Sequence, residues 1–441
     1  MEIEEIKKVI IDQREEINDF FKKEKIIERE LNSDNLKRLL KHPNILVISG
    51  VRRSGKSTLA LLLLKDEKYG YMDFDDERLA GFSHYDLNKL IQSFYELYGN
   101  NLDYFVFDEI QNVKNWEVFL TRLRKTKKIV ITGSNAKLLS GELSTHLTGR
   151  YIDFILYPFS FKEFLTFKGI DFKKDSSIYS TKEVAQIKRI LEEYIKIGGF
   201  PEVFKFGRAI TSRIYGDIVT KDILFRYRIK NRNTFKELSN YLLSNFSEKI
   251  SYSKLRNIFA IKNVHTIKNY VEYLSSSFLI SILEKFSYKL KQKIIAPKKV
   301  YGIDAGLINA ITFQFSENIG RLMENIVFLE LLRKRSYFDD YFEVYYWNDY
   351  YGREVDFVLK KGRVISQLIQ VCRDLSFIQT KERELKSLIK ASDELNCSNL
   401  LVITYDYEGE EKIGGKNIKF ISLWKWLLET SNKPMKNKIK R

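Results

Sequence analysis

The sequence predicts an α/β protein built around a parallel sheet with helices on both faces. Two observations predict this fold. The apolar run at residues 44–49 leads into a glycine-containing loop and then into the helix-forming segment LALLLLK. A second apolar run, at residues 103–109, ends in two carboxylates. Strands buried on both faces are near-continuous apolar runs, and functional groups gather at the carboxyl ends of such strands.

The chain is long enough for several domains. It has 441 residues, and a single hydrophobic core stops growing at roughly 250–300 residues. From the changes of pattern along the chain we expect five segments: an α/β core with an N-terminal helical lead at 1–180, a helical lid or linker at 181–234, a winged helix at 235–312, a second α/β domain at 313–430 and a basic tail at 431–441.

The composition favours a polyanionic partner. Lys and Arg outnumber Asp and Glu by 75 to 58, which gives a net charge of +17. Nucleic acid is the first expectation, and a Lys-rich thermophile composition with no specific partner is the alternative. The two cysteines favour a reducing compartment. No apolar run is long enough to span a bilayer and the acidic start is no signal peptide, so we expect a soluble, cytoplasmic protein.

The first motif is the loop GVRRSGKST at residues 50–58. It matches the phosphate-binding pattern G-x-x-x-x-G-K-[ST] between a strand and a helix. The glycines allow successive N–H groups to surround a phosphate, Lys56 reaches the β- and γ-phosphates, and the Ser57 hydroxyl binds Mg²⁺. The motif therefore predicts ATP and Mg²⁺ as ligands, and the predicted contacts are Gly50, Arg53, Ser54, Gly55, Lys56, Ser57 and Thr58.

The second motif is the strand DYFVFDE, which ends in Asp108 and Glu109. A buried central strand carries its last residues to the nucleotide crevice. We expect Asp108 to hold Mg²⁺ and Glu109 to act as the base that polarises the attacking water. A Glu directly after the Asp indicates hydrolysis in addition to binding.

Two further candidates lie near the next strands. Asn135, with Ser134 beside it, follows the apolar run at 128–132 and is placed to sense the γ-phosphate. Either residue is an equally good N-cap for a following helix. Arg150 precedes the next strand, where its guanidinium is a candidate arginine finger toward the nucleotide of its own or a neighbouring subunit. An ordinary surface arginine is the alternative.

Taken together, these motifs resemble archaeal AAA-type P-loop ATPases. The resemblance covers residues 20–425 and rests on GVRRSGKST, VFDEIQN, ITGSNAKLLS, L-x-GR, YPFSFKEF and GGFPEV. It implies a sheet in which the sensor strand lies between the strand before the phosphate loop and the strand that ends in Asp108. It also implies a helical lid, a winged helix and a restriction-endonuclease-like domain of the PD-(D/E)xK type.

The segment 235–307 predicts a winged helix. The segments SYSKLRNIF (251–259) and NVHTIKNYVEYLSSSFL (263–279) predict two helices joined by a turn, and two strands follow. The outward positions of the second helix hold His265, Lys268 and Asn269. The connection SYKLKQKIIAP between the strands is a candidate basic wing with Lys289, Lys291 and Lys293. Such a module binds DNA through its second helix and wing. A protein-binding role is the alternative.

The C-terminal domain keeps only part of the nuclease pattern. Glu324 and Asp356 match the first two acidic positions that the resemblance implies. The E-x-K positions hold Gln370 and Cys372, which removes a metal ligand and the cation beside the nucleophile. Arg373 or Lys381 would have to substitute from a shifted position. We therefore expect a nuclease-like domain that does not cut DNA.

The sequence thus predicts an Mg²⁺-dependent ATPase that couples nucleotide state to a DNA-binding winged helix and an inactive nuclease-like domain. Two alternatives remain: a non-catalytic, nucleotide-dependent switch for a protein partner, and an ATP-regulated nuclease.

Overall fold

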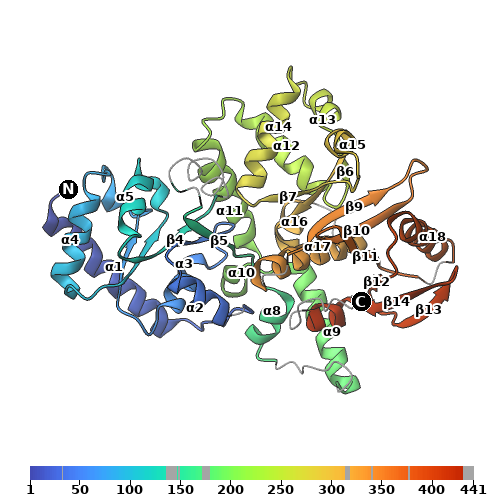
Figure 1. Ribbon diagram of the computed structural model, residues 1–441, viewed down its shortest axis with the longest axis horizontal. Coiled ribbons are helices and arrows are strands. Elements are labelled where there is room, and N and C mark those ends of the chain that lie inside the picture. Colours follow the sequence, from blue (N-terminus) through green and yellow to red (C-terminus); the bar gives the residue numbers. More distant parts are fainter. Residues whose placement is uncertain are drawn as a thin grey trace. The chain divides into compact units, whose positions relative to one another are not determined.

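The computed structural model describes residues 1–31, 33–135, 147, 149–170, 179–312, 318–338, 341–375 and 378–430 (Figure 1). The chain divides into two compact units. The first comprises Met1–Tyr157 with Ser276–Phe278, and the second comprises Pro158–Ser275 with Leu279–Arg441. Among the helices of the described ranges, none is both long and apolar enough to cross a membrane. The basic tail at 431–441 lies outside the described residues.

The first unit contains a five-stranded parallel sheet in the order β2-β3-β4-β1-β5. The strand before the phosphate loop, β1, is buried along its whole length, and β3 and β4 are buried except at their first residues. The β4 strand lies between β1 and β3, which confirms the expected sheet of the P-loop type. The strands are β1 (Ile45–Ser49), β2 (Tyr69–Asp73), β3 (Tyr104–Asp108), β4 (Lys128–Gly133) and β5 (Tyr151–Ile155).

Helices flank this sheet. The N-terminal helix α1 packs against α4 and β2, and α3, which follows the phosphate loop, packs against β1, β3 and β4. Stacked aromatic rings, such as those of Phe105 and Phe107 with centroids 6.1 Å apart, fill the core. The helices are α1 (Ile3–Lys23), α2 (Ser33–Lys41), α3 (Lys56–Leu63), α4 (Leu87–Tyr98) and α5 (Trp116–Leu123), with single 3₁₀ turns η1 (Glu77–Leu79) and η2 (Ile110–Asn112).

The second unit begins with helices whose ends follow from sequence. Ser160 and Ser180 each form a capping box with the Glu three residues later, which satisfies the first N–H groups of α8 and α9. The GGFPE motif follows α9, and the Gly199 N–H donates to the buried Asp304 carboxylate at 2.6 Å. The elements are α8 (Phe161–Phe167), α9 (Thr181–Ile197), α10 (Pro201–Phe206), α11 (Ala209–Asp217) and the π-helix η4 (Ile218–Phe225).

A three-stranded antiparallel sheet with the order β6-β8-β7 follows. The connection between β7 and β8, which is the candidate basic wing, contains helix α15. Leu, Lys, Gln and Ile tolerate a helix well, and Pro297 prevents its continuation. The elements are α12 (Arg232–Ser244), β6 (Lys249–Ile250), α13 (Tyr252–Ile258), α14 (Val264–Ser276), β7 (Ile280–Leu283), α15 (Leu290–Ile295), β8 (Lys298–Gly302) and α16 (Ala305–Ile311).

The last part of the second unit is a six-stranded mixed sheet in the order β13-β14-β12-β11-β10-β9. The β11, β12 and β14 strands are parallel, and the other neighbours are antiparallel. Helix α18 packs on β10 and β11. The elements are α17 (Ile319–Tyr337), β9 (Glu343–Asn348), β10 (Glu354–Lys361), β11 (Val364–Cys372), α18 (Ile378–Leu395), β12 (Leu400–Thr404), β13 (Gly409–Ile413), β14 (Lys416–Ser422) and α19 (Leu423–Thr430).

Candidate nucleotide site

The phosphate loop joins β1 to α3, and its shape depends on two glycines. Gly50 has φ +150°, and a Cβ there would lie 2.2 Å from the carbonyl oxygen of Leu156. Gly55 has φ +93° and is the N-cap of α3. The buried Lys56 ammonium donates to the Val51 carbonyl at 3.1 Å, inside the loop. The loop thus turns sharply around a lysine that points back into it, as a phosphate site requires.

Arg29 holds the loop from outside the motif. Its two terminal nitrogens donate to the carbonyl oxygens of Ser54, at 2.9 Å, and Tyr157, at 2.6 Å. Because one planar guanidinium bridges both carbonyls, it fixes the loop relative to the chain that follows β5. Arg53 within the loop also has a positive φ, of 66°.

Asp108, at the end of β3, is buried and held by two hydroxyl groups. The Tyr71 hydroxyl donates to its Oδ2 at 3.0 Å, and the Thr132 hydroxyl donates to its Oδ1. Tyr71 lies on β2 and Thr132 on β4, so the two neighbouring strands orient the carboxylate together. Two donors therefore fix the orientation of the Asp108 carboxyl group at the carboxyl edge of the sheet.

Glu109 follows with a left-handed backbone, φ +49°. The side-chain amide of Gln111 donates to its carboxylate. The left-handed turn takes Glu109 out of the strand direction that Asp108 follows. The two carboxylates therefore have separate surroundings, as their different expected roles require.

A third carboxylate, Asp73, lies directly opposite Asp108 in the register of β2 and β3. Burial, and then the neighbouring charge of Asp108, raise the pKa of Asp73 to about 7. Asp73 therefore holds a proton for part of the time at neutral pH. Gln13 of α1 fixes this strand end, because its side-chain amide accepts from the Asp73 N–H at 2.9 Å and donates to the Asp73 carbonyl at 3.1 Å.

A groove of about 680 Å³ opens beside these residues. Ser57 and Thr58 of α3 line it, together with Tyr71 and Asp73 of β2 and with residues of α1. Carboxylate and hydroxyl oxygens are the ligands that Mg²⁺ prefers. Ser57 and Asp108 therefore have the chemistry to hold the ion with a nucleotide phosphate.

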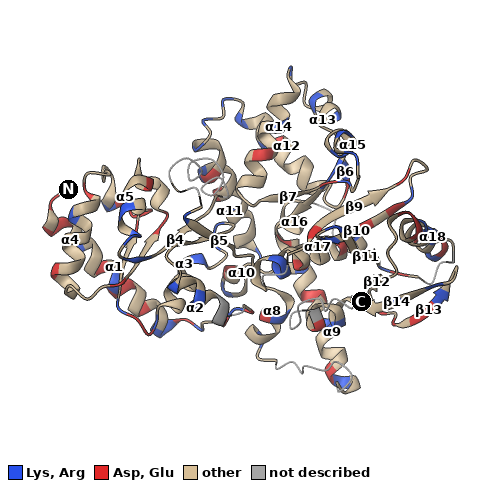
Figure 2. Cartoon of the chain, viewed as in Figure 1, with Lys and Arg blue, Asp and Glu red and all other residues tan. Residues whose placement is uncertain are grey.

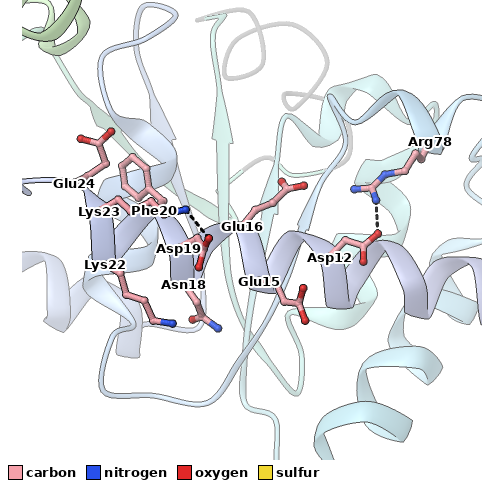
Figure 3. Close-up of a pocket in the computed structure, with 10 residues that line it drawn as sticks. All are labelled: Asp12, Glu15, Glu16, Asn18, Asp19, Phe20, Lys22, Lys23, Glu24 and Arg78. Atoms are coloured by element: carbon pink, nitrogen blue, oxygen red, sulfur yellow. Dashed lines mark hydrogen bonds and ion pairs between the residues drawn. The ribbon is translucent and has the colours of Figure 1, made fainter.

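A second hollow, of about 810 Å³, follows the C-terminal half of α1 and shares Glu16, Phe20 and Arg78 with the first (Figure 3). Its lining is mostly charged. Lys23 pairs with Asp19 at 2.8 Å and Arg78 with Asp12 at 2.5 Å, as the dashed lines show. The lining has five carboxylates against three cations, so it does not favour a phosphate group, and we assign no ligand to this hollow.

The phosphate loop fits a nucleotide phosphate on its own geometry. Within the described part of the chain, the buried Ser54 hydroxyl has no hydrogen-bond partner, although buried polar groups are almost always satisfied. This hydroxyl lies inside the loop, 3.3 Å from the position that a Gly50 Cβ would take. A phosphate oxygen would satisfy it.

Asn135 and Arg150 lie at opposite edges of the sheet. Asn135 is buried and follows β4 at the carboxyl edge, where β1 and β3 also end. The helix that Ser134 or Asn135 would cap falls in 136–146, outside the described residues. Arg150 precedes Tyr151, which pairs with Ile45 at the start of β1, so it lies roughly 15 Å, one strand length, from the phosphate loop. This position argues against Arg150 as a finger within its own subunit.

Comparison with known proteins identifies the chain's relatives. Residues 42–165 match the model of an AAA domain. The uncharacterised protein MJ1544 of the archaeon Methanocaldococcus jannaschii is 38% identical over 429 residues, which cover 92% of each chain. The chain belongs to the same family. An uncharacterised protein of the bacterium Haemophilus influenzae, 32% identical over 409 residues, covers 87% of this chain and 94% of its own length.

The AAA match and the sheet order together confirm an AAA-type P-loop domain in this family member. The Walker-type ATPase PABY2304 of Pyrococcus abyssi is a similar solved structure, with 17% identity and a TM-score of 0.44 over 65% of this chain and 96% of that one. The later parts of the chain match two domains of unknown function, DUF8612 at 188–318 and DUF4143 at 319–426.

In the DUF4143 region of this family member, the structure brings Glu324 and Asp356 together around a lysine that the sequence did not indicate. Lys299 of β8 places its ammonium 2.7 Å from Glu324 and 3.1 Å from Asp356. Burial alone would lower the pKa of Lys299, but the charge of Glu324, followed by those of its other neighbours, raises it well above its ordinary value. The lysine therefore remains charged.

Gln370 and Cys372, which stand at the E-x-K positions of the nuclease pattern, each have a defined local environment. Gln370 accepts from the Asp356 N–H at 3.2 Å and donates to Glu384 at 2.6 Å. Burial raises the pKa of Cys372 to about 11, so it stays a thiol. Lys381 pairs with Glu411 at 2.7 Å, on β13. A shifted Lys381 therefore does not replace the missing lysine, and Arg373 is exposed.

The basic surface of residues 249–302 is partly as expected. His265 and Lys268 on α14 are exposed, as are Lys289 and Lys291 at α15. Figure 2 shows blue segments at α15. Lys293 is different, because it pairs with Glu284 at 3.0 Å and donates to the Tyr345 hydroxyl at 3.3 Å.

Sequence reasoning missed Arg29, Tyr71, Thr132 and Lys299. Tyr71 and Thr132 left a faint signal, since each is a polar side chain near the end of a short apolar strand. Lys299 left one as well, because two consecutive lysines open the strand KKVYG, in which every residue is buried. Arg29 left none: only the folded chain places it against the loop.

Proposed function

We propose that the protein hydrolyses ATP with Mg²⁺. The observation that carries this proposal is the meeting of Lys56, Asp108 and Glu109 at one edge of a sheet whose β4 strand lies between β1 and β3. Mg²⁺, when bound, supplies positive charge that stabilises the negative charge building up on the phosphates. Ser57 and Asp108 are the residues proposed to hold it.

The chain's own residues divide the remaining work. The Lys56 ammonium donates a hydrogen bond to the Val51 carbonyl in this structure, and it would donate to phosphate oxygens when a nucleotide is bound. Glu109 would accept the proton of the water whose oxygen bonds to the γ-phosphorus as the bond to the β-phosphate oxygen breaks. The Gln111 amide, which donates to Glu109, would orient that carboxylate. Asn135 is proposed as the γ-phosphate sensor, and Arg150 as a contact toward a neighbouring subunit.

The test is the release of phosphate from ATP by the parent, Glu109→Gln and Lys56→Ala. Glu109→Gln should bind ATP and lose turnover by about 10²–10⁴-fold, because an amide accepts no proton. Lys56→Ala should weaken both binding and turnover. Glu67→Gln, an exposed acid of the same unit, is the matched control and should behave as the parent. If Glu109→Gln hydrolyses ATP at the rate of the parent, the base is wrongly assigned. If the parent binds ATP without hydrolysing it, the non-catalytic, nucleotide-dependent switch is favoured.

We propose in addition that residues 235–312 form a DNA-binding winged helix. The element order α12-β6-α13-α14-β7-β8, with β8 central in its sheet, supports this proposal. The second helix, α14, and the β7–β8 connection would contact DNA, with α15 taking the place of an extended wing. The exposed Lys289 and Lys291 are the proposed phosphate contacts.

Lys289→Ala/Lys291→Ala should lower affinity for duplex DNA to a similar degree for unrelated sequences. The slope of log affinity against log salt should fall by about one for each lysine that contacts a phosphate. Lys412→Ala/Lys419→Ala removes the same charge from two exposed positions of β13 and β14 and should leave the slope unchanged. Equal losses in both pairs would mean that only net charge matters. ATP hydrolysis with and without duplex DNA then tests the coupling.

We propose, finally, that residues 319–426 have a nuclease-like fold and do not cut DNA. The support is Gln370 and Cys372 at the positions of the missing carboxylate and lysine, on one face of β11. Incubation of the parent with plasmid and single-stranded DNA, in Mg²⁺ or Mn²⁺, should leave both intact. Cleavage that disappears in Asp356→Ala would restore the ATP-regulated nuclease.

A further inference from the structure

Three carboxylates surround the ammonium of Lys299. Its Nζ lies 2.7 Å from Glu324 Oε1, 2.7 Å from Glu354 Oε1 and 3.1 Å from Asp356 Oδ1. The lysine side chain is only 2% exposed. An ammonium has three N–H bonds and here finds one acceptor for each.

The other atoms of the cluster complete this arrangement. The Tyr301 hydroxyl donates to Glu324 at 2.7 Å, and the Val371 N–H donates to Asp356 Oδ2 at 2.9 Å. Lys249 of β6 pairs with Glu354 Oε2 at 2.5 Å. Each carboxylate thus directs one oxygen, Oε1 or Oδ1, at Lys299. Buried charges persist when they are paired and hydrogen-bonded in this way.

The carboxylates come from the elements that would carry metal ligands in a nuclease-like domain. Glu324 lies on α17, and Asp356 lies on β10. The lysine comes from outside this domain, on β8 of the three-stranded sheet. Across the described ranges, no group of three or more His, Cys, Asp or Glu side chains is arranged to hold a metal ion. The three carboxylate oxygens lie 2.7–3.1 Å from the lysine nitrogen, farther than the roughly 2.0–2.6 Å at which oxygen ligands bind a divalent ion. The residues therefore do not fit a metal as they stand and would have to close in on one after the lysine is removed.

We propose that Lys299 is the resident cation of this site, its ammonium occupying the position in which a nuclease-like domain would bind a divalent ion. The inference rests on the proposed nuclease-like fold of residues 319–426 and is independent of the proposed ATPase. It adds a second cause of inactivity to the loss of the E-x-K residues: the wild-type chain excludes the metal with its own side chain. Removing that side chain should therefore create a divalent-cation site.

The experiment compares Lys299→Met with Lys298→Met in the full chain. Lys298 is the neighbouring residue of β8, is similarly buried and pairs with Glu284 at 3.2 Å, so its loss controls for removing a buried lysine. Both variants carry Asp108→Asn, which removes the proposed metal ligand of the nucleotide site. Mn²⁺ is the probe, and calorimetry and the electron paramagnetic resonance of free Mn²⁺ report how much is bound.

Lys299→Met should bind one more equivalent of Mn²⁺ than Lys298→Met, at least about tenfold more tightly than any site of the control, since three carboxylates without a counter-ion favour a divalent cation. Mn²⁺ should also raise its melting temperature, because binding to the folded state alone stabilises it. Adding Asp356→Asn should remove both effects.

A folded Lys299→Met that binds no more Mn²⁺ than Lys298→Met would overturn the inference. So would a parent chain that binds Mn²⁺ at this site, as judged by loss of that binding in Asp356→Asn. If three unpaired carboxylates prevent Lys299→Met from folding, Lys299→Met/Glu354→Gln removes one charge and keeps Glu324 and Asp356, and the same two outcomes apply to it. The Mn²⁺ experiment can refute the role of Lys299 without refuting the proposed lack of nuclease activity. Only cleavage of DNA by the parent would refute the latter.

Discussion

The substitution Gly50→Ala tests whether the phosphate loop has the shape described. A Cβ at this position would lie 2.2 Å from the Leu156 carbonyl oxygen and 3.1 Å from its carbon. Non-bonded carbon and oxygen atoms do not approach so closely, so the backbone must move by roughly 1 Å. It cannot move freely, because the Leu156 N–H donates to the Ser49 carbonyl at 2.7 Å and holds the two segments together.

The expected cost has two parts. Forcing an extra carbon into packed surroundings costs about 1–3 kcal/mol, and holding alanine in a backbone conformation reserved for glycine costs about 1–3 kcal/mol more. Gly55→Ala is the matched control, since φ is +93° there but the nearest atom, Arg29 Nη1, lies 3.8 Å away. It suffers the second cost only. The effect of alanine on the unfolded chain is common to both variants and cancels.

Gly50→Ala should therefore be about 1–3 kcal/mol less stable than Gly55→Ala. The measurement is unfolding in urea, monitored through the amide hydrogen exchange of peptides that cover β1 and β5. Local monitoring is needed because the two units need not unfold together. Both variants should bind a fluorescent ATP analogue more weakly, since both distort the N–H groups around the phosphate. Equal stability of the two variants would refute the close approach of Gly50 to Leu156.

Two further predictions concern hydrogen bonds that only the folded chain makes. Tyr71→Phe removes a hydrogen-bond donor to Asp108, and such a bond to a charged acceptor is worth about 1.5–3 kcal/mol. Half-maximal ATP hydrolysis should therefore need about ten- to a hundredfold more Mg²⁺ than in the parent. Tyr104→Phe is the control, and an unchanged Mg²⁺ requirement in Tyr71→Phe would contradict the role of Tyr71. Burial raises the pKa of Asp304 from 3.8 to about 6, so the folded state keeps this carboxyl group protonated at a pH where the unfolded chain ionises it. The free energy of unfolding should therefore fall by up to about 3 kcal/mol as the pH rises from 4 to 6. Asp304→Asn should flatten that change, as measured by amide exchange around Gly199, and a slope equal to that of the parent would locate the titration elsewhere.

The nucleotide half of this protein was largely predictable from sequence because its signals are local. An apolar strand, two glycines at fixed spacing and a helix define the phosphate loop within residues 44–64, and the next motif names Asp108 and Glu109. The place of β4 between β1 and β3 followed from resemblance to a known family, and the structure confirms it. The short helix α15 within the candidate wing was not predicted, because periodicity does not separate a short helix from a loop in a six-residue segment.

What the sequence by itself determined is therefore the identity of the groups at the phosphate loop, since each is adjacent to its neighbours in the chain. The tertiary structure alone decided what surrounds them: Arg29 on the loop, Tyr71 and Thr132 on Asp108, and Asp73 opposite it. It also decided that Lys299 lies among Glu324, Glu354 and Asp356, residues 25–57 positions further along the chain. Contacts of this kind depend on strand register and helix packing, and no local pattern of residues encodes which distant side chain will come to lie beside a buried charge.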